Sequence, residues 1–320
     1  MVGAIIGDIV GSRWEFDPTN DYNFEWLSKE NGFTDDTICT MAIADALLND
    51  LDFGKAIHDW CNRYPHPMGG YGGRFAQWVH SDNPQPYNSF GNGAAMRVSP
   101  VAHWFKDLDE VLDAAAGTAL PSHNHDEGIK GAQTVAMAIF RALQYNGCRY
   151  QEAPLHIDEI LQECVQFSGY DINMPKSSVF NRFDETCQGT VPVALKIISM
   201  ATSFEDAVRM AVSLGADADT LGAIVGSIAE SIWGIPLVMR RQIEEFLPEE
   251  MQDIISLFHF KRPSSFKPLI DMTFYKKDYS EAAWDLLEDD ERNELMEVVD
   301  KEKERKLELM KERGKAREQW

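Results

Sequence analysis

Apolar residues recur at helical spacing along most of this chain, and no stretch alternates apolar with polar residues as a half-buried strand does. The pattern therefore predicts an all-α protein. Glycine, proline and capping residues mark the ends of the expected segments. Helices are expected at about residues 2–15, 38–48, 53–64, 74–79, 108–119, 128–145, 155–167, 191–201, 204–213 and 221–233, with a further helical run after residue 93.

The C-terminal part of the chain has a different pattern. Residues 280–320 are dense in charge and contain few large apolar residues. We therefore divide the chain into a domain at 1–262 and a charged, helical extension at 263–320. Oppositely charged residues four positions apart favour a solvated helix. We interpret residues 280–320 as a solubilising tail, and we expect a truncation after about residue 280 to leave the fold and the chemistry intact. The alternative is a partner-binding helix with an apolar stripe that begins at Trp284.

The first predicted helix carries a stripe of glycines. Gly3, Gly7 and Gly11 recur every four residues and share one face, which permits very close packing, and Glu15 lies at the end of this stripe. Glu15 is either a functional carboxylate or a solvated helix end. Residues 16–32 have no clear period and predict a surface loop.

Two segments combine carboxylates with hydroxyls at a predicted helix start. Residues 33–37 read Phe-Thr-Asp-Asp-Thr, and residues 215–222 read Gly-Ala-Asp-Ala-Asp-Thr-Leu-Gly. Their oxygens are hard ligands, which suit Mg²⁺, Mn²⁺ or Ca²⁺ rather than zinc. Taken alone, each segment is more simply an ordinary N-cap. Two of them in one chain suggest a shared role.

Another loop places small residues before a helical run. Ser89, Gly91, Asn92 and Gly93 allow backbone N–H groups to approach a ligand, and a helix start favours an anion such as phosphate. The segment matches neither a Walker sequence nor a dinucleotide fingerprint. A plain turn is therefore the alternative.

A polar turn before residue 128 carries two histidines, His123 and His125, together with Asp126. These three residues raise the possibility of a zinc site. The spacing of the histidines fits a loop, however, and no third partner lies nearby in the sequence. We therefore disfavour zinc.

Composition excludes several classes of function. The chain has 320 residues and a formal net charge of −22, which argues against nonspecific binding to nucleic acid or to an anionic membrane. Its five scattered cysteines favour reduced thiols and a cytoplasmic location. The start lacks a basic leader, and no apolar run is long enough to span a bilayer, so we expect neither a signal peptide nor a membrane protein.

Four segments occur in an order that resembles the ADP-ribosylglycohydrolase family, particularly its bacterial members such as the dinitrogenase-reductase-activating glycohydrolases. The segments are Gly7-Asp8 followed by Glu15; residues 33–37; Gly91-Asn-Gly-Ala-Ala-Met-Arg97 with Ser122-His-Asn-His125; and residues 215–220. The likeness covers about residues 1–260. Each segment alone is modest, but the ordered set is specific.

This resemblance implies an all-helical fold with two Mg²⁺ or Mn²⁺ ions at the base of a cleft. It implies metal binding by Thr34, Asp35, Asp36, Asp217, Asp219 and Thr220. It implies catalytic roles for Glu15, Asp36 and Asp217. It implies substrate binding by Ser89, Phe90, Gly91, Asn92, Gly93 and His123.

The chain also departs from the family pattern. Ala216 and Ala218 replace residues common in other members, but neither side chain is expected to bind metal. Residues 69–73 contain no aspartate, although the nitrogenase-regulating members carry one nearby. This absence puts a second general base in doubt. The chain after about residue 262 has no counterpart that we identify.

We therefore expect a metal-dependent hydrolase that removes ADP-ribose from a modified protein or a small conjugate by cleavage at C1″ of the ribose. One alternative is a non-catalytic ADP-ribose-binding module. Another is a metal-dependent phosphohydrolase acting on a nucleotide diphosphate. Product analysis separates the three.

Overall fold

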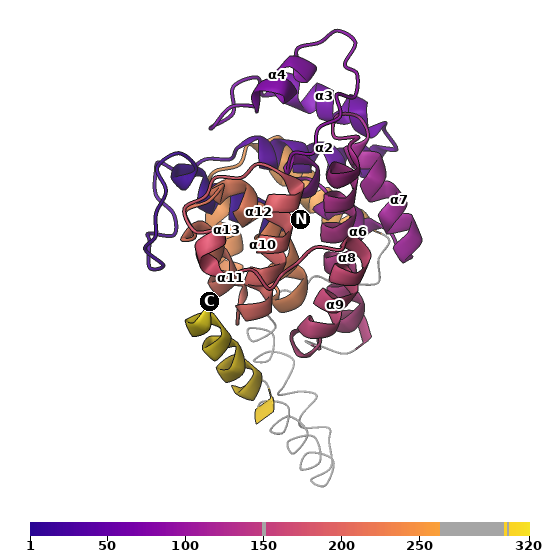
Figure 1. Ribbon diagram of the computed structural model, residues 1–320. Helices are drawn as coiled ribbons and strands as arrows, with labels where there is room; N and C mark the ends of the chain where they lie inside the picture. Colours follow the sequence, from indigo (N-terminus) through magenta and orange to yellow (C-terminus); the bar gives the residue numbers. More distant parts are fainter. Residues whose placement is uncertain (149–151, 263–303, 306) are drawn as a thin grey trace, which may run out of the picture.

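The computed structural model describes residues 1–148, 152–262, 304–305 and 307–320 (Figure 1). Within these ranges the chain is helical and has no strand, and its β-type pairing is one bridge between Gly91 and Thr186. The all-α prediction is confirmed. The α-helices are α1 (Val2–Gly11), α2 (Asp35–Asn49), α3 (Phe53–Arg63), α4 (Gly73–Val79), α5 (Gly93–Met96), α6 (Ser99–Trp104), α7 (Leu108–Ala119), α8 (Asp126–Cys148), α9 (Ile157–Ser168), α10 (Cys187–Met200), α11 (Phe204–Val212), α12 (Ala218–Trp233), α13 (Leu237–Glu244) and α14 (Glu249–Lys261). Short 3₁₀ helices lie at η1 (Ser12–Trp14), η2 (Ala153–Leu155) and η3 (Lys176–Ser178).

Several helices begin where a polar side chain accepts a hydrogen bond from a free backbone N–H of the first turn. This N-cap satisfies a donor that has no partner within the helix. The capping residues are Thr34 for α2, Asp52 for α3, Asp107 for α7, Thr186 for α10 and Ser203 for α11. Local sequence therefore fixes these starts.

Helices α1 and α12 form the centre of the molecule, and Figure 1 shows the N-terminus lying beside α12 in the middle of the fold. All ten residues of α1 are buried, as are all but two residues of α12. A Cβ added to Gly7 would lie 1.9 Å from the carbonyl oxygen of Gly222, so the two backbones touch directly. The same contact repeats along both helices, pairing Gly3 with Gly226 and Gly11 with Ala218. The close packing expected from the glycine stripe is confirmed.

Two predicted helices differ from the structure. The run after residue 93 is two short helices, α5 and α6, separated by a turn at Arg97 and Val98. Helix α10 begins four residues before the predicted residue 191. The cap at Thr186 starts it, and Pro192 stands inside it.

Helices α13 and α14 were not expected from the sequence. Each begins directly after a proline, Pro236 or Pro248. Proline suits the first positions of a helix because its fixed φ is already helical and its missing N–H has no partner there. The sequence pattern was interpreted as ending at these prolines, which in the structure start new helices.

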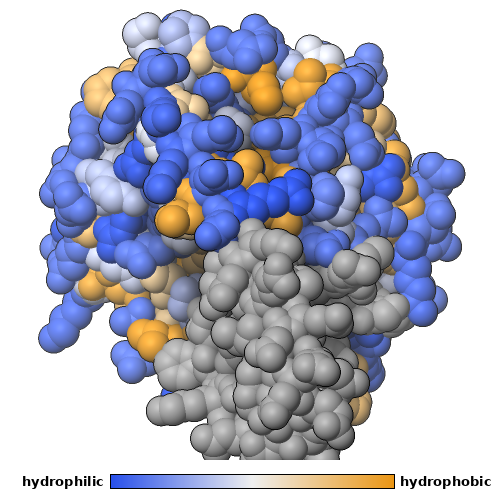
Figure 2. All heavy atoms as spheres, turned by 90° about the horizontal axis from the view of Figure 1, so that it is seen from below, coloured by the Kyte–Doolittle hydropathy of each residue, from blue (hydrophilic) through white to orange (hydrophobic). Residues whose placement is uncertain are grey.

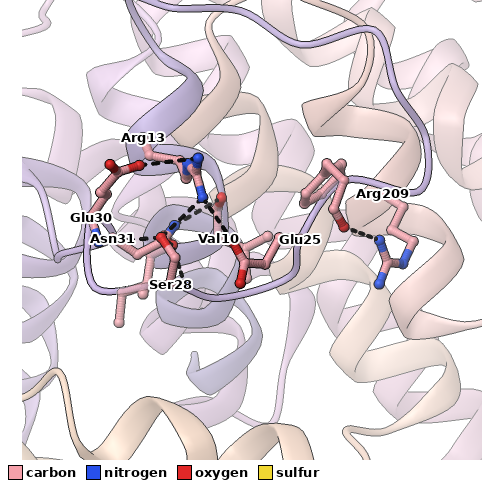
Figure 3. Close-up of polar contacts among 9 residues, drawn as sticks. Val10, Arg13, Glu25, Ser28, Glu30, Asn31 and Arg209 are labelled. Carbon is pink, nitrogen blue, oxygen red and sulfur yellow. Dashed lines mark hydrogen bonds and ion pairs between the residues drawn. The ribbon is translucent and has the colours of Figure 1, made fainter.

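The loop between η1 and α2 is irregular, as predicted, but many side chains anchor it (Figure 3). Arg13 pairs with Glu30 at 3.0 Å. The Asn31 side chain donates to carbonyl oxygens of the last turn of α1 at 2.7 and 3.3 Å. Arg209 of α11 donates to the carbonyl oxygen of Phe24 at 2.9 Å. This loop therefore holds a fixed shape beside the end of the glycine stripe.

The C-terminal segment at residues 307–319 is a helix that packs against the body of the molecule (Figure 1). Arg317 pairs with Asp206 of α11 at 2.8 Å, and the indole of Trp320 donates to the carbonyl oxygen of Met174 at 3.1 Å. Arg313 is buried. The predicted helix is present, but the interpretation as a wholly solvated tail is wrong for these residues. The stripe that begins at Trp284 lies outside the described residues.

The described residues that are visible from below are mainly hydrophilic. Figure 2 shows hydrophobic residues scattered between hydrophilic ones on this face. This agrees with the excess of acidic residues in the sequence. In the part of the chain that the structure describes, no helix has the length and hydropathy needed to cross a bilayer.

Candidate active site

A cleft of about 480 Å³ opens where the loop after α1, residues 69–75, the loop before α5 and the start of α12 meet. Ten of the residues singled out in the sequence line it: Glu15, Asp35, Ser89, Gly91, Asn92, Gly93, His123, Asp217, Asp219 and Thr220. Three do not line it. Thr34 and Asp36 are buried, and the partly exposed Phe90 ring contacts His125. The chain thus brings segments up to two hundred residues apart to one cleft.

One end of the cleft is acidic. Glu15, Asp217 and Asp219 each offer a carboxylate oxygen, and these three oxygens lie within 4.8 Å of one another. The glycine contact between α1 and α12 explains this meeting, because Glu15 follows α1 while Asp217 and Asp219 stand at the start of α12. Among the described residues, no other group of three histidine, cysteine or acidic side chains has this geometry.

Side-chain hydrogen bonds join the acidic residues to their neighbours. Asn92 donates to Asp217 at 2.7 Å, which orients that carboxylate. The Thr220 hydroxyl donates to Asp36 at 3.1 Å, which connects the start of α12 with the start of α2. The two oxygen-rich helix starts identified in the sequence are therefore in direct contact.

Asp8 is part of this arrangement, although sequence reasoning did not select it as a site residue. It is fully buried in α1 and accepts hydrogen bonds from the backbone N–H and hydroxyl groups of Thr34 and Thr37. Asp8 thereby ties α1 to the start of α2. The signal was an isolated carboxylate within the apolar run of residues 2–10.

Crowding of like charges shifts the titration of these groups. Burial, followed by the Asp219 charge, raises the pKa of Glu15 to about 8. The same two causes raise the pKa of Asp8 to about 7, despite opposing hydrogen bonds from Thr37 and Thr34. Burial and neighbouring carboxylates also raise the pKa of Asp36 and of Asp217. The acidic end therefore tends to hold protons unless another positive charge is supplied.

The residues at this end fit a divalent cation. One oxygen of Asp36 and one of Asp219 are buried without any hydrogen-bond partner. Buried carboxylate oxygens normally have a partner, and a bound ion is one explanation when they do not. The donor set consists of oxygens only, which suits a hard cation. Protein atoms alone leave these charges uncompensated.

The cleft lining also contains basic and aromatic side chains, including Arg74, Tyr71 and Tyr87. The Arg97 guanidinium is fully buried, and its central carbon lies 5.9 Å from the centre of the Phe75 ring. Phe75 belongs to the helix expected at residues 74–79, and no sequence signal indicates that it borders a cleft. In the structure it is both buried and part of the cleft wall.

The glycine loop at residues 69–73 packs against Glu15. Gly69 has a φ of +76°, and a Cβ there would lie 2.4 Å from a carboxylate oxygen of Glu15. The backbone angle therefore favours glycine at this position, and any larger residue would also displace the Glu15 carboxylate. Residues 69–73, which contain no aspartate, thus place backbone atoms beside Glu15.

The two histidines of the polar turn have separate roles. The ring of His125 accepts a hydrogen bond from the backbone N–H of Glu127 at 3.0 Å, in the first turn of α8. His123 instead faces the cleft and contacts Ser122. The two rings thus have different hydrogen-bond partners, and the expectation of no zinc site stays a prediction.

Comparison with known proteins gives a consistent result. The family model described as ADP-ribosylglycohydrolase matches residues 1–264. The uncharacterized protein YegU of Escherichia coli is 27% identical over 73% of this chain and 86% of its own length. The ADP-ribosylarginine hydrolase Tri1 of Pseudomonas putida is 23% identical over 73% of this chain and 70% of its own length.

Two further matches are more distant or shorter. The ADP-ribosylhydrolase ARH3 of Xenopus tropicalis is 26% identical over 45% of this chain and 49% of its own length. A solved structure titled ADP-ribosylglycohydrolase-related protein complex superposes with a TM-score of 0.57 at 23% identity. It covers 80% of this chain and 95% of that chain, which shows a shared fold.

Proposed function

This chain belongs to the ADP-ribosylglycohydrolase family, and from that premise we propose that it hydrolyses the bond between C1″ of ADP-ribose and an acceptor. The observation that carries the proposal is the meeting of Glu15, Asp217 and Asp219 in a cleft that Arg74 and Arg97 also line. A ligand that carries both ribose hydroxyls and phosphates matches a cleft with acidic and basic side chains.

The acidic end would hold two divalent cations, Mg²⁺ or Mn²⁺. The proposed ligands are Thr34, Asp35, Asp36, Asp217, Asp219 and Thr220, with Glu15 close enough to contribute. When bound, such ions hold ribose hydroxyls and lower the pKa of a water molecule. The orphaned oxygens of Asp36 and Asp219 support this assignment.

Glu15 is proposed to transfer the proton in the reaction. A glycosidic bond breaks with oxocarbenium character, so a carboxylic acid that protonates the departing acceptor lowers the barrier. In the fold without a cation the pKa of Glu15 is raised to about 8, and a bound cation would lower it, so that Glu15 can both give up and take up a proton. Asn92 orients Asp217, and Thr220 orients Asp36, so both carboxylates would keep one direction during turnover.

The loop before α5 would bind the remainder of the substrate. Ser89, Gly91 and Gly93 line the cleft beside His123, and the absence of side chains at the two glycines leaves room for a ligand. Phe90 would contribute an aromatic surface at the edge, where 41% of it is exposed. Backbone N–H groups can hold phosphate oxygens even though the whole chain is acidic.

The acceptor is to be assigned by experiment, because the name of Tri1 gives arginine as the acceptor while that of ARH3 gives none. The protein is incubated with arginine-linked and serine-linked ADP-ribosyl peptides in Mg²⁺ or Mn²⁺, and products are identified by mass spectrometry. Free ADP-ribose together with unmodified peptide supports the proposal. AMP with ribose phosphate would instead reveal a phosphohydrolase. Tight ADP-ribose binding without any product would reveal a binding module.

A further inference from the structure

Three buried side chains, two of which line the cleft, form a hydrogen-bonded chain. A terminal nitrogen of Arg97 lies 3.0 Å from the hydroxyl of Ser122, and that hydroxyl lies 2.8 Å from Nδ1 of His123. Arg97 and Ser122 are fully buried, and His123 is 5% exposed. The direction of each bond follows from the chemistry of the groups.

Arginine can only donate, so Ser122 accepts from Arg97. The hydroxyl has one proton, and the nitrogen of His123 is the acceptor that the structure offers it. If Nδ1 carried the proton instead, Ser122 would accept twice and its own buried proton would have no partner. Leaving a buried hydroxyl donor unpaired costs about 1–3 kcal/mol. The arrangement therefore favours Nδ1 as acceptor and Nε2 as the protonated nitrogen.

The same surroundings disfavour a charged ring. Burial and the adjacent Arg97 charge lower the pKa of His123 well below its usual range. Among the described residues Arg97 forms no ion pair with a carboxylate, and its charge disfavours a second cation on the adjacent ring. Its Nε and one terminal nitrogen have no hydrogen-bond partner.

The protonated nitrogen faces the ligand space. Nε2 of His123 lies 3.0 Å from the position of a Cβ added to Gly93, and 3.3 Å from that of one added to Gly91. Both glycines line the cleft. A donor therefore points to the place where the loop before α5 leaves room for a ligand.

We propose that Arg97 and Ser122 are positioning residues that hold His123 as the neutral tautomer, so that its Nε2–H donates to an oxygen of the bound substrate. The tautomer follows from the protein alone, whereas the identity of the substrate oxygen rests on the proposed function. A neutral ring can donate a hydrogen bond to a ligand oxygen without placing a second cation beside Arg97. It also keeps its proton as the pH changes near neutrality.

The tautomer is tested without ligand by heteronuclear NMR of the histidine ring nitrogens. The chain has eight histidines, and the signals lost in His123→Gln identify those of His123. We expect a protonated Nε2 and an unprotonated Nδ1 between about pH 6 and 8. Ser122→Ala should mix the tautomers, and Arg97→Lys, which keeps a cationic donor, should preserve them. A protonated Nδ1 in the unaltered protein would overturn the proposal.

The consequence for binding is tested by calorimetry with ADP-ribose. Ser122→Ala should weaken binding about five- to tenfold, the usual worth of one hydrogen bond. The side-chain amide of a glutamine always carries N–H donors, so His123→Gln needs no partner to determine which atom is protonated. In the His123→Gln background, Ser122→Ala should therefore have no further effect. An equal loss in both backgrounds would show that Ser122 supports only the fold, and would overturn its positioning role.

The two experiments separate this inference from the proposed function. If the unaltered protein does not bind ADP-ribose, the proposed function fails. The NMR measurement then still decides whether Arg97 and Ser122 select the tautomer. If binding is tight but the tautomer is the other one, the function stands and the positioning role fails.

Discussion

At the scale of single residues, the site is defined by charges that the protein does not balance itself. Glu15, Asp8, Asp36 and Asp217 all have a raised pKa because burial and neighbouring carboxylates disfavour their charged forms. Thr34, Thr220 and Asn92 supply hydrogen bonds but no positive charge. A cation would reverse this balance, which makes the site's response to metal measurable.

The stabilisation by Mn²⁺ should grow with pH. Below about pH 6 Glu15 and Asp8 are protonated in the fold, and a proton held at the site must be released before an ion binds, whereas above about pH 8 these two groups become ionised. The difference in Tm between Mn²⁺ and EDTA should therefore increase from pH 6 to 8. The cation-free fold loses stability over the same range on account of these groups, because their pKa in the fold is above that of the unfolded chain.

Thermal melts at a series of pH values check this expectation. Asp217→Asn serves as the comparison, since it removes one ligand and one negative charge, and its Mn²⁺ effect should be smaller at every pH. A Mn²⁺ effect that is independent of pH would place the ion elsewhere.

Glu15→Gln and Asp35→Asn should separate catalysis from binding. Glutamine keeps the shape of Glu15 but cannot transfer a proton, so turnover should fall by about two to four orders of magnitude. Affinity for ADP-ribose should hardly change. Asp35→Asn should weaken metal and ligand binding together. Steady-state rates and calorimetry measure the two effects, and an unchanged rate in Glu15→Gln would leave that residue as a helix end.

At the scale of elements, the contact between α1 and α12 decides the geometry of the acidic end. The sequence predicted this close packing from the spacing of Gly3, Gly7 and Gly11, and it predicted helices α2 and α12 with starts three residues later than observed. It did not predict α13 and α14, because the prolines before them were taken as breaks. It also missed Arg97 and Phe75 as cleft residues, because a buried cation over an aromatic ring has no periodic signal.

Gly7→Ala should destabilise the protein strongly. The added methyl group would meet the backbone of Gly222 rather than a movable side chain, so relief requires the helices to separate. We expect the free energy of unfolding to fall by about 3 kcal/mol or more, the upper end for overpacking. Urea denaturation measures the change.

Gly314→Ala is the matched control. This glycine lies within the helical segment 307–319, and an added Cβ meets no atom within 4 Å. Alanine is the better helix former by about 1 kcal/mol, so stability should rise slightly or stay unchanged. A similar loss in both variants would contradict the backbone contact as the cause.

At the scale of the whole molecule, the C-terminal helix connects distant parts of the chain. Arg317 contacts Asp206, and the guanidinium also lies 4.2 Å from the ring centre of Tyr22 in the loop before α2. Trp320 contacts the loop after α9. From its charge composition alone, the C-terminal tail was expected to be dispensable for folding. The cytoplasmic location, inferred from cysteine usage, stays a prediction.

Arg317→Ala should lower the free energy of unfolding by about 1 kcal/mol, because a partly buried ion pair and a cation–π contact are lost together. Lys311→Ala changes an exposed residue of the same segment and should stay within about 0.5 kcal/mol. Denaturation of both variants in parallel gives the comparison. If neither variant changes the free energy of unfolding, residues 307–320 contribute no stability and behave as a free tail.

The backbone contact between α1 and α12 also bears on how such a protein can change over evolutionary time. Substitutions that enlarge a stripe glycine are penalised at once, so the spacing between Glu15 and the aspartates of α12 has little freedom to drift. The loops at residues 16–32 and 69–73 border the same cleft without backbone interlocking of this kind. New acceptor preferences would therefore arise in these loops, while the bond-breaking apparatus is inherited unchanged.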